Sequence, residues 1–117
     1  AALAIRTELL GDESAEVAQT LRILGLARLA LGDRAGARAA LERSVELSRT
    51  VYAEGHPRLA EALVSRADLA LAEGRTAEAR RDLEEALGIR EARLGADNPL
   101  SVETRAALAR LSAPVSQ

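Results

Sequence analysis

The sequence repeats itself at a fixed interval of 42 residues, and this interval constrains the fold more than any other feature. When residues 18–44 are shifted by 42 positions, ten identical residues come into register without a gap. At twice the interval, residues 3–11 match residues 87–95 at five positions. A fixed interval of this length is typical of a solenoid, whose units stack and bury one face against their neighbours. The identical residues are Ala18/Ala60, Leu21/Leu63, Leu29/Leu71, Ala30/Ala72, Gly32/Gly74, Ala35/Ala77, Ala37/Ala79, Arg38/Arg80, Leu41/Leu83 and Glu42/Glu84, and at twice the interval Leu3/Leu87, Ile5/Ile89, Arg6/Arg90, Leu10/Leu94 and Gly11/Gly95.

Each unit is predicted to consist of two antiparallel helices joined by a short turn. Ala and Leu supply nearly all of the 48% hydrophobic content, and both are strong helix formers. Apolar residues recur at helical spacing within each predicted helix. The expected helices span 14–31, 34–52, 57–73, 76–94 and 99–111, and their apolar positions include Leu21, Leu24, Ala27, Leu31, Ala37, Leu41, Val45 and Leu47. The predicted fold class is therefore all-α, with about five helices.

Glycine marks the turn inside each predicted hairpin. Gly32 follows the first helix, where glycine suits the C-terminus, and Asp33 is a predicted N-cap of the second helix. Gly74 occupies the same position in the next unit. These short turns require the two helices of a unit to be antiparallel.

The connections between units carry helix-start signals. Pro57 and Pro99 are expected at the first position of their helices, where the absent N–H costs nothing. Asn98 is a predicted N-cap, and Ser14 is expected to play that part after a turn at residues 11–14. We call the first helix of each unit a first-type helix and the second a second-type helix. Residues 1–10 are therefore expected to be the end of a second-type helix, with the chain turning back before residue 14.

The domain organisation follows from these boundaries. We predict one repeat domain over residues 1–112, with units at about 14–55 and 56–97, partial units at both ends, and a flexible tail at 113–117. Polar residues at Arg105, Arg110 and Ser112 indicate a cap on the last helix. Residues 1–10 lack the helix on which they would pack, so we expect an exposed apolar face there. Such a face favours self-association or pairing with a second copy.

Composition argues against several classes of function. The net charge is −2, all 16 basic residues are Arg, and acids alternate with them, so no basic stripe for nucleic acid is visible. No apolar run approaches the roughly 18–20 residues that span a bilayer, so no membrane partner is expected. There is no Cys and a single His, which leaves no thiol chemistry and no His cluster for a metal. We expect no enzyme activity, no cofactor, no metal and a cytoplasmic location, and the Ala-, Gly- and Arg-rich composition suggests a bacterial source.

Two residues near the first inter-unit turn invite a chemical interpretation. His56 precedes Pro57, and a turn or capping role is favoured over proton transfer or ligand binding. Tyr52 is the one aromatic residue, and a packing role is favoured because a nucleic-acid stacking platform needs several aromatics. The acidic pairs 12–13 and 84–85 lack the oxygen-ligand spacing of a calcium loop and are expected to be solvated helix ends.

Residues 21–41 resemble a tetratricopeptide repeat. Small residues stand where that family places them for helix contact, and the turn sequence Gly-x-x-Ala-x-Ala occurs in both units, unlike in HEAT or armadillo repeats. The 42-residue interval and the Gly-Ala-Asp-Asn-Pro turn at 95–99 are similar to the long repeats of the kinesin light chain type. Two departures are Arg66, where the first unit has Leu24, and Arg105, where the others have Leu21 and Leu63. The small residues are Gly25, Ala37 and Ser44 in the first unit and Ala67, Ala79 and Ala86 in the second.

The resemblance implies a right-handed superhelix whose first-type helices line a concave groove for an extended or helical peptide. The asparagines that line the cargo groove of kinesin light chains are not found here. The residues that the resemblance places in the groove are Gln19, Arg22, Leu26, Glu61, Val64, Asp68, Glu103, Ala106 and Arg110.

The expected function is therefore protein–protein interaction, with the groove binding a partner protein or peptide as part of a larger bacterial scaffold or regulator. Two alternatives stay open: a homo-oligomerisation module, and a peptide-sensing regulatory domain of a larger bacterial signalling protein. The remaining interpretation is that a groove of two and a half units is too short to bind a partner alone. The identity of the partner does not follow from these residues.

Overall fold

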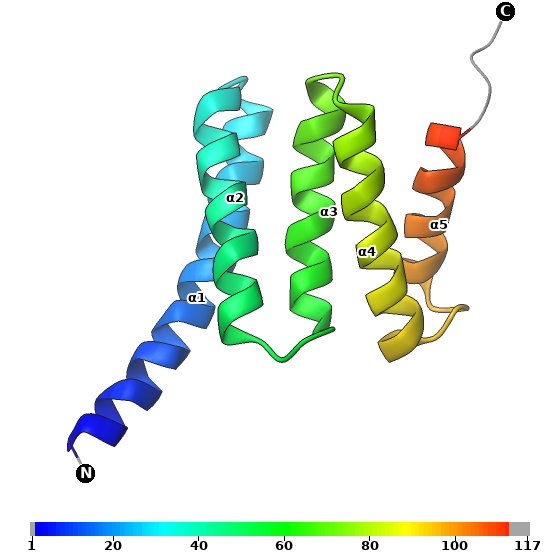
Figure 1. Cartoon of the computed structure of the whole chain (residues 1–117). Helices are drawn as coiled ribbons and strands as arrows, with labels where there is room; N and C mark the ends of the chain where they lie inside the picture. The colour runs from blue at the N-terminus through cyan, green and yellow to red at the C-terminus, as the bar shows by residue number, and fades with distance from the viewer. Residues whose placement is uncertain (1, 113–117) are drawn as a thin grey trace, which may run out of the picture.

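The computed structural model of the chain describes residues 2–112, with side chains described over residues 14–111, and these residues form an array of five α-helices (Figure 1). The all-α prediction is confirmed. Each helix packs on the next along the chain, and α1 also contacts α3 directly across the boundary between units. The helices are α1 (Ala2–Ala30), α2 (Arg34–Val51), α3 (Pro57–Ala72), α4 (Thr76–Leu94) and α5 (Pro99–Ser112).

The 42-residue interval reappears in the positions of the helices. α2 and α4 begin 42 residues apart, as do α3 and α5. Gly32 and Gly74 end the first helices of the two hairpins with φ of 86° and 76°, a conformation that glycine adopts without a Cβ clash. The backbone N–H three residues beyond the last residue of each helix then donates to a carbonyl of its last turn, from Asp33 to Arg28 and from Arg75 to Ala70, each at 2.8 Å. The predicted hairpin turns are confirmed.

Three predicted capping interactions are present. A side-chain oxygen of Asp33 accepts the Gly36 N–H at 2.9 Å at the start of α2. Nδ1 of His56 accepts the Arg58 N–H at 3.0 Å and caps α3, and Oδ1 of Asn98 accepts the Leu100 N–H at 2.9 Å. Each contact satisfies a backbone donor that has no partner within its helix. The capping role predicted for His56 is therefore confirmed.

Small side chains let the helices approach closely in the core. All six residues predicted to be small contact positions are buried. A Cβ at Gly25 would lie 2.5 Å from Cγ of Leu41, so α1 and α2 touch with no room for a methyl group. Larger residues fill the spaces between these contacts. The main cluster joins α2, α3 and α4 and contains Val45, Leu59, Ala60, Ala62, Leu63, Ala86 and Ile89.

The prediction of a turn at residues 11–14 is wrong. α1 continues as one helix from Ala2 through this segment, so Ser14 lies inside the helix and is not an N-cap. The other two inter-unit turns are each followed by a proline, which disfavours helical backbone in the residue before it. Position 15 is Ala where the later units have Pro57 and Pro99. Gly11 alone weakens a helix by about 1 kcal/mol, which does not end it.

The apolar stripe expected on the first helix is only partly covered. Leu21 is half-buried, but Leu24, Ala27 and Leu31 are exposed, and Leu31 retains 85% of its surface. In contrast, Ala37, Leu41 and Val45 of α2 are buried, as expected. The face predicted for residues 1–10 lies outside the residues whose side chains are described, and the predicted tail at 113–117 lies outside the described chain. The first half of α1 projects past the ends of α2 and α3 in Figure 1.

Candidate partner-binding surface

The residues predicted for the groove lie on α1, α3 and α5, the first-type helices, whose common surface we term the first-helix face. Gln19, Arg22 and Glu61 are brought together by polar contacts between α1 and α3. Val64 is half-buried, because part of its side chain packs against the buried apolar residues of the core. The remaining predicted residues, Leu26, Asp68, Glu103, Ala106 and Arg110, do not join this group by a hydrogen bond or ion pair within residues 14–111.

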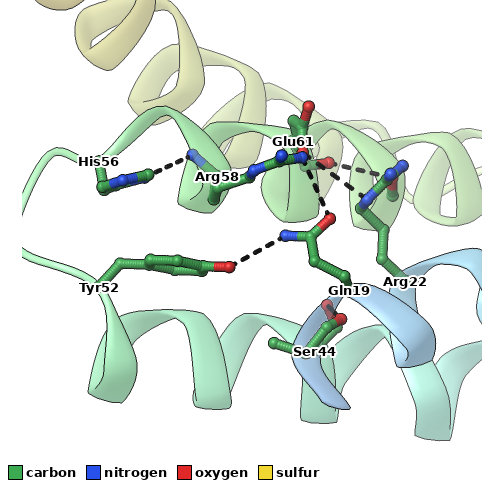
Figure 2. Close-up of polar contacts among 9 residues, drawn as sticks. Gln19, Arg22, Ser44, Tyr52, His56, Arg58 and Glu61 are labelled. Carbon is green, nitrogen blue, oxygen red and sulfur yellow. Dashed lines mark hydrogen bonds and ion pairs between the residues drawn. The ribbon is translucent and has the colours of Figure 1, made fainter. Parts of the chain in front are cut away.

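A chain of polar contacts crosses from α1 to α3 (Figure 2). Gln19 donates from Nε2 to the Tyr52 hydroxyl at 3.3 Å, and its Oε1 accepts from Nη1 of Arg58 at 3.4 Å. The same nitrogen of Arg58 donates to Oε1 of Glu61 at 3.0 Å. Nε of Arg22 lies 4.0 Å from that oxygen. One carboxylate thus serves two guanidinium groups from two helices.

Tyr52 and His56 form the edge of this network beside the turn between α2 and α3. Their rings stack with centroids 4.5 Å apart and an angle of 22° between the ring planes. His56 meanwhile accepts the Arg58 N–H, so the same turn positions the backbone that carries this guanidinium. The packing role predicted for Tyr52 is confirmed, and the structure adds a hydrogen bond from Gln19 to its hydroxyl.

Arg22 and Arg58 carry one positive charge more than their partner can neutralise. Nε of Arg22 is buried and has no hydrogen-bond partner among the described residues. Hydrogen bonding and charge from Glu61 raise the pKa of Arg58. The Arg58 guanidinium stays charged, since arginine does not titrate in the physiological range. The site is suited to an additional anionic group.

Arg58 and Arg90 were missed by the sequence prediction. Arg90 is only 7% exposed, and its Nη1 donates to Oγ1 of Thr104 on α5 at 2.9 Å. Burial lowers its pKa, while the charges of Glu61 and Glu103 oppose that shift. Arg90 thus links the α3 and α5 parts of the first-helix face electrostatically. Two features of the sequence could have identified these residues. Arg90 is repeated as Arg6, and Arg58 precedes Glu61 by three residues, a spacing at which side chains on a helix can pair.

Asp68 is the acidic residue farther along α3. It is exposed as a residue, but neighbouring protein atoms partly desolvate its carboxyl group and raise its pKa. Glu103 and Arg110 are exposed on α5. The first-helix face therefore has an arginine-rich region at α1 and the start of α3, followed by an acidic position.

A second polar region lies between α2, α3 and α4 and encloses a cavity of about 180 Å³. Two pairs of its charged side chains neutralise each other. Arg66 pairs with Asp82 through two hydrogen bonds of 2.9 and 2.8 Å, and Arg38 pairs with Glu73. Because both of these arginines already have a carboxylate of their own, they are weaker candidates for binding an acidic ligand than Arg22 and Arg58, which share one.

Comparison with known proteins identifies the repeat. Residues 23–92, more than half of the chain, match the family model for the tetratricopeptide repeat. Comparison with curated proteins finds no match. Among the described residues, no helix has the length and apolar character to cross a membrane, and no group of three potential metal ligands occurs. The matched region begins in the last turns of α1, runs to near the end of α4 and contains the turns of both hairpins, and the chain belongs to the tetratricopeptide repeat family.

Proposed function

We propose that this chain is a binding module, and not a catalyst, whose first-helix face takes an extended segment of a partner protein. Tetratricopeptide repeats are generally protein–protein interaction modules. The polar side chains of Gln19, Arg22, Arg58 and Glu61 lie together on this face, joined by a hydrogen bond between α1 and α3, a hydrogen bond within α3 and an ion pair between the two helices. A rigid surface of this kind loses little side-chain entropy when a partner binds.

The partner segment that fits best is acidic. The observation that carries this is the sharing of one carboxylate, Glu61, by the guanidinium groups of Arg22 and Arg58. The Arg58 side chain is 50% exposed, so an Asp or Glu side chain of a partner can accept from its N–H groups and balance the excess positive charge. Charge-assisted hydrogen bonds of this type are stronger than neutral ones.

The test uses fluorescently labelled extended peptides with Asp and Glu at alternate positions, beside matched peptides with Asn and Gln. We expect the chain to bind the acidic peptides, and binding to weaken with salt. The double variant Arg22→Gln, Arg58→Gln should lose at least about tenfold in affinity, since a hydrogen bond to a charged group contributes ~1.5–3 kcal/mol. The variant Arg43→Gln, which changes an exposed arginine of α2, is the matched control. Equal binding of the neutral peptides, or full binding by the double variant, would contradict the proposal.

Self-association is the second candidate function, and a specific observation favours it. Three large apolar residues are exposed on α1 and a fourth directly follows it. Exposed apolar surface is typical of interaction sites when it is extensive. The four are Val17, Ile23, Leu24 and Leu31, with 46, 59, 39 and 85% of their surface exposed.

Other expectations stay predictions. They are the kinesin light chain type of repeat, a regulatory role in a larger bacterial signalling protein, a cytoplasmic location, and the lack of a nucleic-acid or membrane partner. The sequence of the complete gene tests the regulatory role, because an adjacent kinase or DNA-binding domain would support it.

A further inference from the structure

The packing of α4 on α5 shows what the exposed surface of α1 is built to contact. Near the end of α4, Arg90 donates a hydrogen bond to Thr104 of α5, and Ser101 beside it is fully buried. Shifted back by two intervals of 42 residues, these positions are Arg6, Thr20 and Val17. Residues 3–11 also repeat residues 87–95 at five positions. The chain therefore carries both halves of a third copy of this helix–helix contact.

The α1 half of that contact is uncovered. Val17 is 46% exposed, whereas its equivalent in the second unit, Leu59, is 5% exposed. Ile23 is 59% exposed, whereas its equivalent Ser65 is 3% exposed. Both equivalents belong to α3, which packs against the second-type helix α2 that precedes it. The surface is exposed on α1 because no second-type helix packs there within the described chain.

The straight course of α1 prevents residues 3–10 from supplying that cover within one copy. Residues 6 and 20 are 14 positions apart in a continuous helix, a separation of roughly 21 Å along the axis. In the later unit, the turn at Gly95–Asn98 reverses the chain between the equivalent residues. At residues 11–14 there is no such reversal.

We propose that a second copy of the chain provides the missing contact. Residues 3–10 of each α1 pack against residues 17–23 of the other α1, and the two helices run antiparallel, as α4 and α5 do. Residues 6 and 20 pair twice in this arrangement, so the two-fold axis passes close to residue 13. Such a reciprocal contact closes a dimer and leaves no open end. This inference rests on self-association, the second candidate function, and is independent of peptide binding.

Crosslinking tests the geometry, and the absence of Cys makes it direct. The double variant Arg6→Cys, Thr20→Cys is treated with a short bis-maleimide and run on a denaturing gel. We expect a covalent dimer, no dimer from either single variant, and a dimer from Glu13→Cys alone, because residue 13 meets its own copy near the axis. A crosslink confined to the monomer, or none, would overturn the proposed pairing.

Two further variants separate the pairing from self-association in general. Ala15→Pro restores the proline found at positions 57 and 99 and should turn the chain back at residues 11–14. We expect sedimentation equilibrium to show a dimer for the original chain and a monomer for Ala15→Pro, whose two-cysteine form then crosslinks within one chain. Val17→Glu should also be monomeric, while Leu100→Glu, at a comparably exposed apolar residue of α5, stays dimeric. A monomeric original chain overturns self-association itself, whereas a dimer that Ala15→Pro and Val17→Glu leave intact overturns only the pairing.

Discussion

Arg66 and Asp82 show how one residue's departure from the repeat is balanced by another's. The first unit has Leu24 and Ala40 at the equivalent positions. In the second unit, Arg66 makes two hydrogen bonds to Asp82, whose side chain is only 10% exposed. The hydrogen bonds from Arg66 to Asp82 raise the pKa of Arg66. The second unit therefore has an ion pair between α3 and α4 at the positions where the first unit has two apolar residues.

This exchange predicts strong coupling between the two positions. Arg66→Leu leaves a largely buried carboxylate without its partner, and we expect it to lower the free energy of unfolding by about 2 kcal/mol. Arg66→Leu combined with Asp82→Ala restores the residues of the first unit and should be nearly neutral. Urea denaturation of the single and double variants measures the coupling. Additive effects of the two substitutions would contradict it.

The raised pKa of Asp68 predicts that its ionisation destabilises the folded chain, whereas the ionisation of an ion-paired acid stabilises it. Desolvation raises the pKa of Asp68 in the folded state, so the folded state binds the proton more tightly than the unfolded state does. The free energy of unfolding therefore falls as the pH rises from the unfolded pKa of about 4 through the folded pKa. Asp68→Asn should therefore stabilise the chain at neutral pH and have no effect below pH ~4.

Glu85, whose pKa is lowered by its hydrogen bond to Arg49, is the matched comparison. Glu85→Gln should destabilise at neutral pH and converge with the original chain in acid. Thermal unfolding across this pH range measures both, and a constant effect of Asp68→Asn at all pH values would exclude the explanation.

At the scale of the helix, two glycines in helical positions predict opposite effects of the same substitution. Ala forms helices better than Gly by about 1 kcal/mol. A Cβ at Gly88 meets nothing within 4 Å, so Gly88→Ala should stabilise the chain by ~0.5–1 kcal/mol. A Cβ at Gly25 meets the fully buried side chain of Leu41 at 2.5–2.6 Å, so Gly25→Ala should cost about 1–3 kcal/mol. Chemical denaturation decides both, and a stabilising Gly25→Ala would show that the contact between α1 and α2 is looser than described.

The helix boundaries were predictable wherever a residue close to the boundary marks it. Pro57, Pro99 and Asp33 act within a few residues, so the starts of α2, α3 and α5 could be placed from sequence to the residue. The five positions in residues 3–11 that match residues 87–95 suggested a helix end before residue 14, yet the helix continues because the stop signal, a proline at position 15, is absent. Similarity between repeats predicts packing partners, but the local residues decide whether the chain turns.

The candidate site was only partly predictable for a related reason. Gln19, Arg22 and Glu61 could be placed on one face because the resemblance to the tetratricopeptide repeat implies that the first helix of each unit lines the groove. Arg90 belongs to a second-type helix and reaches this face only through its long side chain, which no helical pattern reports. The hydrogen bond between Gln19 and Tyr52 spans 33 residues and depends on how the two units stack.

At the scale of the whole molecule, stability should depend on position along the array. α3 packs between α2 and α4 and contributes to a cluster that joins all three helices. Within the described chain, α5 packs chiefly on α4, through a buried arginine and the half-buried Ala107, Leu108 and Leu111. In a linear array each helix is stabilised mainly by its immediate neighbours. A helix with one neighbour should therefore open more readily than a helix with two.

Two truncations of leucine test this gradient. Leu63 is fully buried in the cluster between α2, α3 and α4, so Leu63→Ala should cost ~2–5 kcal/mol and accelerate amide hydrogen exchange in all three helices. Leu108 is half-buried against the α4 side, so Leu108→Ala should cost less and accelerate exchange in α5 alone. In the unsubstituted chain, α5 should already exchange faster than α3. Equal exchange rates in α3 and α5 would show that the five helices open as one cooperative unit, because the contact between α4 and α5 would then be as strong as the contacts around α3.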